Sequence, residues 1–260
     1  MNSRPIKPRD IDFKKVTFSA PRAMGNTGAK MLFINYDGMP FSVQLPELMV
    51  GWDIMFYGDE RNPGSGKYQV SLKFANMSDK KQSEMHSFLE NLDKTLIKAC
   101  QENSASWIKK PKIDESGAKL LYTPLIRHSL DKETGEPNGK YPDEFKIKLV
   151  KRDNQHLFKL FDENTKEVTL DGADIPLEDL IKKGSKLRGV IRCNGVWFAS
   201  GKFGCTWKGE QIKVETPKQV AEYAFEDTDD DDECDKKKDN QISDSEEESS
   251  EEETDSESGL

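Results

Sequence analysis

The chain has 260 residues, of which 33% are charged, and this length allows one elaborated domain or two small ones. No segment approaches the ~18 consecutive apolar residues of a membrane-spanning helix, and residues 1–15 lack the apolar stretch of a secretory signal. We therefore expect a soluble protein that is not secreted. Its four cysteines are widely spaced and form no Cys-x-x-Cys pair, which indicates neither a zinc site nor a disulfide framework.

The net charge of −9 conceals two segments of opposite sign. Residues 226–260 hold 18 acidic residues against three basic ones, a net charge of −15, and the remaining 36 basic and 30 acidic residues give residues 1–225 a net charge of +6. A basic body favours a polyanionic partner, with the acidic tail as a competitor or an interaction arm. A tail that only increases solubility is the alternative.

Short segments rich in β-branched and aromatic residues recur along the body, separated by Gly, Pro, Asn and Asp. This pattern is typical of a mainly β protein, a barrel or a sandwich. The predicted strands cover residues 15–19, 30–36, 40–45, 52–57, 67–75, 119–127, 144–151, 156–161, 186–193, 196–202 and 211–214.

One long amphipathic helix is predicted over residues 79–101, with Ser78 as its N-cap, because apolar residues recur there at three- and four-residue spacing. The apolar face should pack on the sheet. It consists of Met85, Phe88, Leu89, Leu92, Leu96, Ala99 and Cys100. A shorter helix is predicted to begin at Pro176, to be capped by Asp174 and to end before Gly184.

The sequence contains no complete catalytic motif. Residues 63–67 resemble the end of a phosphate-binding loop, but Arg61 replaces its first glycine, Tyr68 replaces the required Ser or Thr, and a strand follows where such a loop needs a helix. No His-Glu-x-x-His or Gly-x-Ser-x-Gly motif occurs. We therefore expect a non-enzymatic protein without cofactor or metal, and an unrecognised nuclease is the rival interpretation.

The body interleaves basic and aromatic residues on its predicted strands. Sequence-independent binding of single-stranded DNA requires this combination, because cations follow the phosphates and flat rings stack on the bases. Alternation over residues 145–149 sends Lys146 and Lys148 to one face, opposite three apolar side chains. Arg188 and Arg192 share a face of the strand over 186–193, at a spacing that suits separate phosphates.

Twelve residues are therefore candidates for binding single-stranded DNA. They are Tyr68, Lys73, Lys140, Tyr141, Lys146, Lys148, Arg188, Arg192, Trp197, Lys202, Phe203 and Lys208. Of the aromatic candidates, Tyr68, Phe203 and Tyr141 are favoured for stacking, whereas Trp197 and Trp207 are either core or stacking residues. The loop over residues 128–143 is long for a hairpin and suits a ligand clamp.

Two blocks of sequence resemble the single-stranded DNA-binding protein family of nucleo-cytoplasmic large DNA viruses, which is similar to a phage replication protein with an acidic tail. The first block comprises residues 122–126, 132–135, 140–142 and 145–148. The second comprises residues 184–191, 195–198, 201–204, 206–208 and Gln211. The likeness covers most of residues 20–260, although the chain ends in Leu260, where phage tails of this type end in an aromatic residue.

This resemblance implies an OB-fold Greek-key barrel, elaborated with extra strands and a long helix, that binds single strands across one open face. It also implies a homodimer, viral replication partners, and a site of action in the nucleus or cytoplasmic viral factory of an infected host cell. The expected domains are an N-terminal arm over 1–20, a DNA-binding domain over 21–225 and a disordered acidic tail over 226–260.

The tail permits a further expectation and a rival function. Ser243, Ser245, Ser249, Ser250 and Thr254 each precede an acid by three residues, a pattern that favours acidophilic kinases, and each phosphate would add roughly −1.5 to −2 charges. The rival function is that of a chaperone, in which the tail itself captures basic, histone-like proteins.

Overall fold

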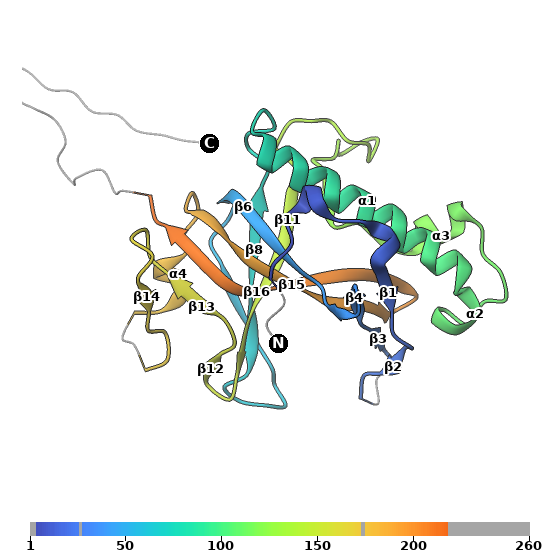
Figure 1. The fold of residues 1–260 in the computed structure, drawn as a ribbon, viewed down its shortest axis with the longest axis horizontal. Helices are drawn as coiled ribbons and strands as arrows, with labels where there is room; N and C mark the ends of the chain where they lie inside the picture. The colour runs from blue at the N-terminus through green and yellow to red at the C-terminus, as the bar shows by residue number, and fades with distance from the viewer. Residues whose placement is uncertain (1–3, 26–27, 173–174, 218–260) are drawn as a thin grey trace, which may run out of the picture. The chain divides into compact units, whose positions relative to one another are not determined.

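The computed structural model describes residues 4–25, 28–172 and 175–217, which form a mainly β structure with one long helix (Figure 1). The chain falls into two units, Met1–Lys218 and Gln219–Leu260, and the second unit lies outside the described residues. The predicted acidic tail over 226–260 therefore lies outside them as well. Within the described ranges, no helix is long and apolar enough to cross a membrane.

Five strands close into a barrel. They are β6 (Ser42–Val50), β8 (Gly66–Lys73), β11 (Glu144–Arg152), β15 (Lys186–Ala199) and β16 (Lys202–Glu215). The pairs β6–β8 and β8–β11 are antiparallel, β11 pairs in parallel with β16, and β15 joins β16 to β6 in antiparallel pairs. This closed order, first-second-third-fifth-fourth, is the Greek-key arrangement of the OB fold. The predicted fold class, an elaborated OB barrel with one long helix, is confirmed.

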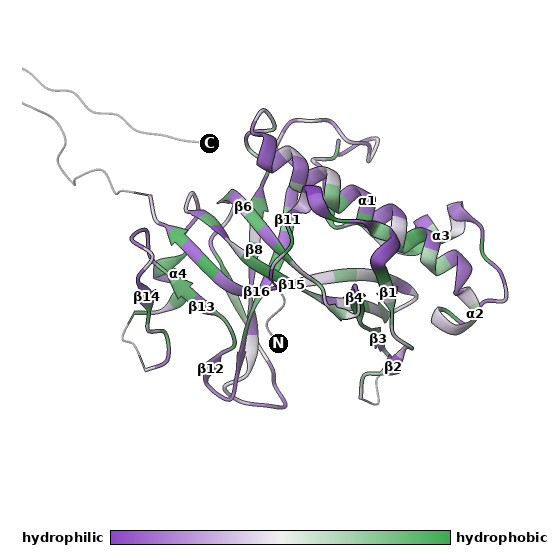
Figure 2. Cartoon of the chain, viewed as in Figure 1, coloured by the Kyte–Doolittle hydropathy of each residue, from purple (hydrophilic) through white to green (hydrophobic). Residues whose placement is uncertain are grey.

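Strand alternation divides the barrel into an apolar interior and a polar exterior, visible as alternating bands along β16 in Figure 2. On β11, Phe145, Ile147 and Leu149 are fully buried, whereas Lys146 and Lys148 between them are partly exposed. The two lysines lie on the outward face, as predicted, because successive side chains of a strand point to opposite sides.

Helix α1 (Lys80–Glu102) packs its apolar face against the barrel, and the seven predicted residues of that face are all buried (Figure 1). The ring of Phe88 meets the rings of Trp207 and Phe41 edge-on, at centroid distances of 5.9 and 6.0 Å. The predicted N-cap is wrong by one residue. Asp79 is the cap: its side chain accepts the N–H of Lys81 at 2.8 Å, and its carbonyl accepts the N–H of Ser83 at 3.0 Å, so the first helical turn begins at Asp79 and not at Ser78.

Shorter elements enlarge the barrel sheet or lie beside it. The additional strands of that sheet are β2 (Arg22–Ala23), β3 (Lys30–Leu32), β7 (Met55–Gly58), β9 (Tyr122–Thr123), β10 (Ile126–Arg127), β12 (Gln155–His156), β13 (Lys159–Phe161) and β14 (Glu167–Val168). A separate small sheet contains β1 (Val16–Phe18), β4 (Ile34–Tyr36) and β5 (Met39–Pro40). The short helical elements are η1 (Pro8–Asp10), η2 (Phe13–Lys15), α2 (Ser104–Trp107), α3 (Glu115–Leu121) and α4 (Leu177–Leu180).

Some predicted boundaries are wrong. The strand predicted over 119–127 begins as helix α3, because Asp114 caps that helix by accepting the N–H of Gly117 at 2.9 Å. The strand predicted over 186–193 and most of the strand predicted over 196–202 form one strand, β15, whose register shifts between Cys193 and Gly195; this strand ends at Ala199, and Lys202 begins β16. Glycine is required at the shift, since a Cβ on Gly195 would lie 2.2 Å from the carbonyl oxygen of Leu32.

Two further predictions concern the second helix and the N-terminal segment. The second helix is the short α4, in which Pro176 occupies the N-cap position, and the predicted cap Asp174 lies outside the described residues. At the other end of the chain, the segment expected as an N-terminal arm packs along the barrel, because Ile6 forms a parallel bridge with Val43 on β6.

Candidate nucleic-acid interface

Three basic side chains form one row across the outside of the barrel. Lys148 on β11 lies beside Lys208 on β16 in the parallel pair, and Lys208 lies opposite Arg192 on β15. Neighbouring strands are about 4.8 Å apart, so the row extends about 10 Å across three adjacent strands. We call these three residues the cationic row.

More cations surround the cationic row. The pKa values of Lys146, Lys148 and Lys208 are all lowered, and burial is the largest cause in each case, because the folded barrel removes water from the ammonium groups. The next cause is a neighbouring positive charge: Arg127 at Lys146, Lys67 at Lys148 and Arg192 at Lys208. A bound anion would relieve both effects, so this surface is suited to phosphates.

One acid balances part of the cationic row. Glu210 places Oε1 2.5 Å from Nη2 of Arg192, and its other oxygen accepts the hydroxyl of Ser42 at 3.3 Å. Neither Lys148 nor Lys208 forms an ion pair with any described residue. The two lysines are therefore the members of the row that remain free to meet an external anion.

An exposed tryptophan lies beside this surface and was missed in the sequence. Trp52 is 56% exposed, and its Nε1 donates to Glu144 at the start of β11, at 2.9 Å. The ammonium groups of Lys73 and Lys183 lie 4.8 and 5.5 Å from the centroid of its ring. The structure thus provides a flat, accessible ring among cations, which is the arrangement that favours stacking on an unpaired base.

The short strand β7 adds further exposed side chains to the same surface. Tyr57 is 45% exposed and lies opposite Lys67 on β8, and Met55 is 62% exposed and lies opposite Gln69. Gln69 in turn lies opposite Lys148. Met55 on β7, Gln69 on β8 and Lys148 on β11 are therefore neighbours across the sheet, so β7 extends the outer surface next to the cationic row to the far side of β8.

Two of the residues predicted to stack are in the core. Tyr68 is 7% exposed and Phe203 is fully buried, because each lies on the inward-facing side of its strand, Tyr68 opposite Leu149 and Phe203 opposite Phe198. The predicted stacking role of these two rings is therefore wrong. Trp207 is also fully buried, and its ring contacts Phe41.

Trp197 differs from Trp207 because it lies on the outward face. Its partner on β16 is Gly204, which lies on the same outward face of that strand as Lys208. The ring of Trp197 covers this glycine. A Cβ on Gly204 would lie 2.9 Å from Cζ2 of the ring, so the glycine allows the ring to lie flat on the strand. Trp197 is partly exposed, and the exposed Lys202 begins the same strand, β16.

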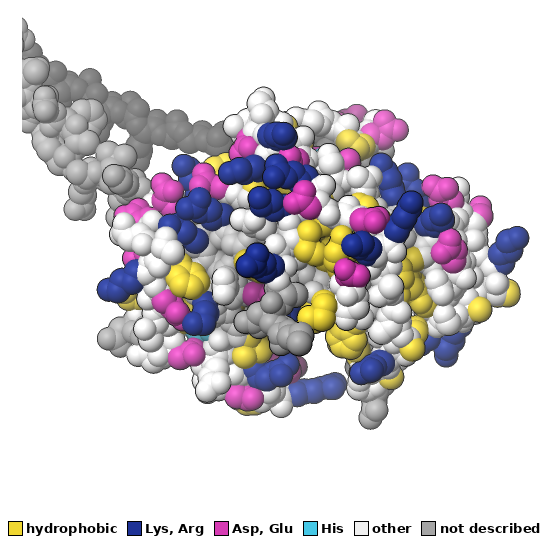
Figure 3. Space-filling view, in the orientation of Figure 1, with side chains coloured by type: hydrophobic (Ala, Val, Ile, Leu, Met, Phe, Trp, Pro, Cys, Tyr) yellow, Lys and Arg dark blue, Asp and Glu magenta, His cyan; other side chains and the backbone are white. Residues whose placement is uncertain are grey.

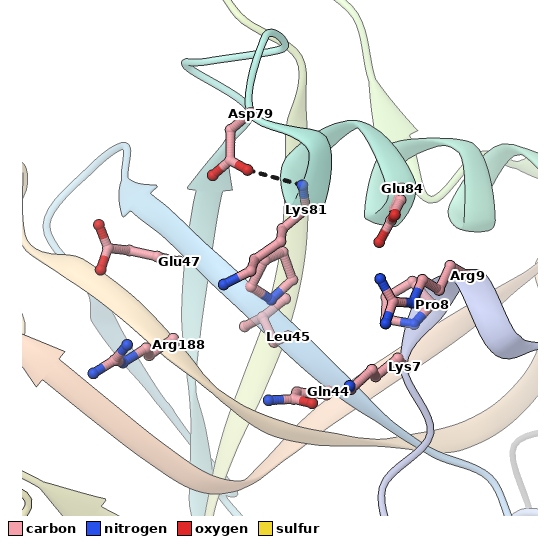
Figure 4. Close-up of a pocket in the computed structure, with 11 residues that line it drawn as sticks. Lys7, Pro8, Arg9, Gln44, Leu45, Glu47, Asp79, Lys81, Glu84 and Arg188 are labelled. Atoms are coloured by element: carbon pink, nitrogen blue, oxygen red, sulfur yellow. Dashed lines mark hydrogen bonds between the residues drawn. The ribbon is translucent and has the colours of Figure 1, made fainter.

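The other predicted residues lie apart from the cationic row. Arg188 lines a pocket of about 480 Å³ between η1, β6 and the start of α1, where basic side chains gather on the visible face (Figures 3 and 4). Its other cations are Lys7, Arg9 and Lys81, and its acids are Glu47, Asp79 and Glu84. This mixed lining has nearly balanced charges and does not extend the cationic row.

The loop over residues 128–143 carries Lys140 and Tyr141, with the ammonium group 5.5 Å from the ring centroid and Tyr141 60% exposed. Asp143 anchors the end of the loop, since its two oxygens each lie 2.8 Å from a ring nitrogen, one of His86 and one of His128. Neither Lys140 nor Tyr141 forms a hydrogen bond, ion pair or ring contact with the cationic row within the described part of the chain. The five predicted phosphorylation sites lie outside the described residues.

The fold and the surface together define an OB-fold protein with an electropositive outer face that carries exposed aromatic rings. No protein-family model and no curated protein matches the chain. Its fold is similar to that of gp2.5, a single-stranded DNA-binding protein encoded by bacteriophage T7, at 14% identity and a TM-score of 0.44, covering 71% of this chain and 91% of that one.

A second similar structure is the single-stranded DNA-binding protein from bacteriophage Enc34 in complex with single-stranded DNA. It has 13% identity and a TM-score of 0.39, and the alignment covers 77% of this chain and 96% of that one. The C-terminal truncation of the Enc34 protein is similar at 11% identity with the same TM-score of 0.39, covering 79% of this chain and 98% of that one.

Proposed function

We propose that this protein binds single-stranded DNA without sequence choice, along the outer face of β8, β11 and β16. The observation that carries the proposal is the cationic row, in which Lys148 and Lys208 lie side by side and form no ion pair with any described residue, although the charge of Glu210 acts on Lys208. Phosphates that bind there would restore the favourable interactions that both ammonium groups lose by burial.

The exposed rings explain why the ligand is a single strand. Trp52, Tyr57 and Trp197 present rings on the outer face, and a base can stack on such a ring only when it is unpaired. Each stacked base contributes about 1 to 3 kcal/mol and is sequence-tolerant, because every base has a flat face.

The acidic tail has a role in the same proposal. Its net charge of −15 competes with DNA for the cationic row when DNA is absent, and it offers an arm for replication proteins when DNA is bound. We extend this to the setting that the sequence resemblance implies: a homodimer that acts in viral DNA replication, recombination or repair, in the nucleus or the cytoplasmic viral factory of an infected cell.

A titration with labelled oligonucleotides tests the proposal. The full chain should bind oligo(dT) more tightly than a duplex of the same length, with an affinity that falls steeply with salt. Equal affinity for the duplex, or no binding at low salt, would refute it.

Removal of residues 226–260 tests the role of the tail. Deletion should tighten the binding of oligo(dT) at low salt, and an unchanged affinity would refute competition by the tail. If deletion instead abolishes capture of a histone-like protein and leaves DNA binding unaffected, the protein is a chaperone of basic proteins.

Phosphorylation would strengthen the competition. Each phosphate on Ser243, Ser245, Ser249, Ser250 or Thr254 adds negative charge to the tail, so the modified full chain should bind DNA more weakly than the unmodified one. Mass spectrometry of protein from infected cells checks the modification, and the absence of phosphate at all five residues would refute it.

A further inference from the structure

A second surface of aromatic and basic side chains lies farther along β15 and β16, where β3 and β2 extend the barrel sheet (Figure 1). Trp197 on β15 lies opposite Met31 on β3, and Met31 lies opposite Arg22 on β2. Side chains at paired positions share a face of a sheet, so all three lie on the same outward face as Gly204. At about 3.4 Å per residue, Gly204 is roughly 14 Å along β16 from Lys208.

Phe33 adds an exposed ring to this surface. It is 45% exposed, whereas the residues on either side of it are buried, so its ring points to the same face as Met31. The guanidinium group of Arg22 lies 5.8 Å from the centroid of that ring. Ser19 holds the backbone of Phe33, because its hydroxyl accepts the Phe33 N–H at 2.9 Å and its own N–H donates to the Phe33 carbonyl at 3.0 Å. We call Trp197, Met31, Arg22 and Phe33 the distal platform.

The stretches of chain that form and surround the distal platform are basic. Residues 16–36 contain β2 and β3, residues 186–209 contain β15 and the first part of β16, and residues 116–130 contain β9, which pairs with β16 at Gly204. Together these stretches hold nine Lys and Arg residues and no Asp or Glu. Exposed rings beside cations, on strands without acids, suit a phosphate-bearing chain with unpaired bases.

We propose that the distal platform is a second subsite for the bound single strand, which leaves the cationic row along β16 and stacks further bases on Trp197 and Phe33. Arg22 neutralises a phosphate beside the Phe33 ring. The proposal rests on the proposed function and keeps binding independent of sequence, because every base has a flat face. Only a strand long enough to pass Gly204 reaches the distal platform.

The dependence of affinity on oligonucleotide length tests this subsite on the full chain. Oligo(dT) strands of about 4 to about 16 nucleotides cover the range of site sizes of OB folds. For Phe33→Ala we expect wild-type affinity for the shortest strand and a loss of roughly 5- to 150-fold for the longest, the contribution of one stacked base.

Two further substitutions of Phe33 separate base stacking from an apolar contact. Phe33→Tyr keeps a flat ring and should bind every length as the wild type does. Phe33→Leu keeps an apolar side chain without a ring, so it should lose affinity for the longest strand as Phe33→Ala does. The control Ile175→Ala removes an apolar side chain that is 57% exposed beside α4, and it should bind every length as the wild type does.

Arg22→Ala tests the phosphate contact. It should reduce the slope of log affinity against log salt by about 0.7 for the longest strand, the value for one phosphate contact on a single strand, and leave the slope for the shortest strand unchanged. Arg9→Ala removes the same charge from η1 and should leave both slopes unchanged.

The outcomes separate this inference from the function on which it rests. Wild-type affinity of Phe33→Ala for the longest strand, or an equal loss at every length, overturns the distal platform and leaves binding along the cationic row intact. Failure of the wild type to bind oligo(dT) of any length overturns the proposed function and the distal platform with it.

Discussion

Lys148 and Lys208 stand side by side on the only parallel pair of the five-stranded barrel, although they come from strands far apart in the sequence. Strand β11 brings Lys148 to this position through its antiparallel pairing with β8, and β16 brings Lys208 there as the last strand of the barrel. The closure of the barrel therefore creates the cationic row. A protein that needed only a stable core would gain nothing from two adjacent ammonium groups that form no ion pair with a described residue.

Replacing the exposed tryptophan should weaken single-strand binding. Trp52→Ala removes a ring that is 56% exposed, and we expect a loss of roughly 5- to 150-fold, equivalent to one stacked base. Trp52→Phe should retain most of the affinity, because it keeps a flat ring. Anisotropy titrations with oligo(dT) measure both. A control variant, Leu120→Ala, removes a side chain that is 80% exposed on α3 and should bind as the wild type does.

If the tryptophan variants and the control bind DNA equally well, bases do not stack on Trp52. In that case the ring serves only to position Glu144, whose carboxylate also accepts the hydroxyl of Ser71 at 2.8 Å.

DNA affinity should fall at alkaline pH. The pKa values of Lys146, Lys148 and Lys208 are lowered in the free protein, so these side chains lose their protons at a lower pH than exposed lysines do. Since a phosphate binds the protonated form, affinity should decrease as pH rises towards the ordinary lysine value, and binding should take up protons.

Titrations with oligo(dA) between pH 7.5 and 10, at constant ionic strength, measure this dependence. Lys148→Arg keeps its charge throughout this range, so its affinity should depend less on pH than that of the wild type. An affinity that is constant up to pH 10 in the wild type would contradict the lowered pKa values.

The stability of the barrel should depend on pH through Asp93 on α1. Burial raises the pKa of this carboxyl group to about 6, although hydrogen bonds from Tyr122 and from the N–H of Leu125 act in the opposite direction. Because the pKa is raised on folding, the stabilising contribution is present below about pH 4 and is lost as pH rises through about 6.

Between pH 4 and pH 7 this loss is on the order of 2 to 3 kcal/mol. Asp93→Asn cannot ionise and does not lose this contribution. Its free energy of unfolding in urea should therefore increase relative to that of the wild type as the pH rises from 4 to 7. Glu102→Gln, at the exposed end of α1, serves as the control. A difference between Asp93→Asn and wild type that stays constant from pH 4 to 7 would show that Asp93 keeps an ordinary pKa.

Local patterns predicted a large part of the fold. Alternation on β11 placed Lys146 and Lys148 outward, and the apolar spacing of α1 predicted its buried face, because both signals depend only on the geometry of one element. The same alternation places Tyr68 inward, since Lys67 and Gln69 on either side of it point outward. The stacking role predicted for Tyr68 ignored this parity.

The site could be predicted only in part, because it depends on pairings between distant strands. Nothing in the neighbourhood of Trp52 indicates that it meets Lys73, Lys183 and Glu144, which are brought together by the closure of the sheet. Likewise, Arg188 and Arg192 lie on the same strand but line different pockets. The pairing of β15 with β6 shifts its register between Leu187 and Gly189, at the position of Arg188. The family resemblance implied a Greek-key barrel, but neither the resemblance nor any local pattern predicted the order of its strands, which the structure shows.

The most direct test of the account removes the two central charges. Lys148→Ala combined with Lys208→Ala should weaken the binding of oligo(dT) more than tenfold at 0.1 M salt and reduce the slope of log affinity against log salt by about 1.4, the value for two lost phosphate contacts. The control, Lys94→Ala combined with Lys98→Ala on the exposed face of α1, removes the same charge and should bind nearly as the wild type does. Equal affinities and equal salt slopes for the two double variants would contradict binding along the cationic row.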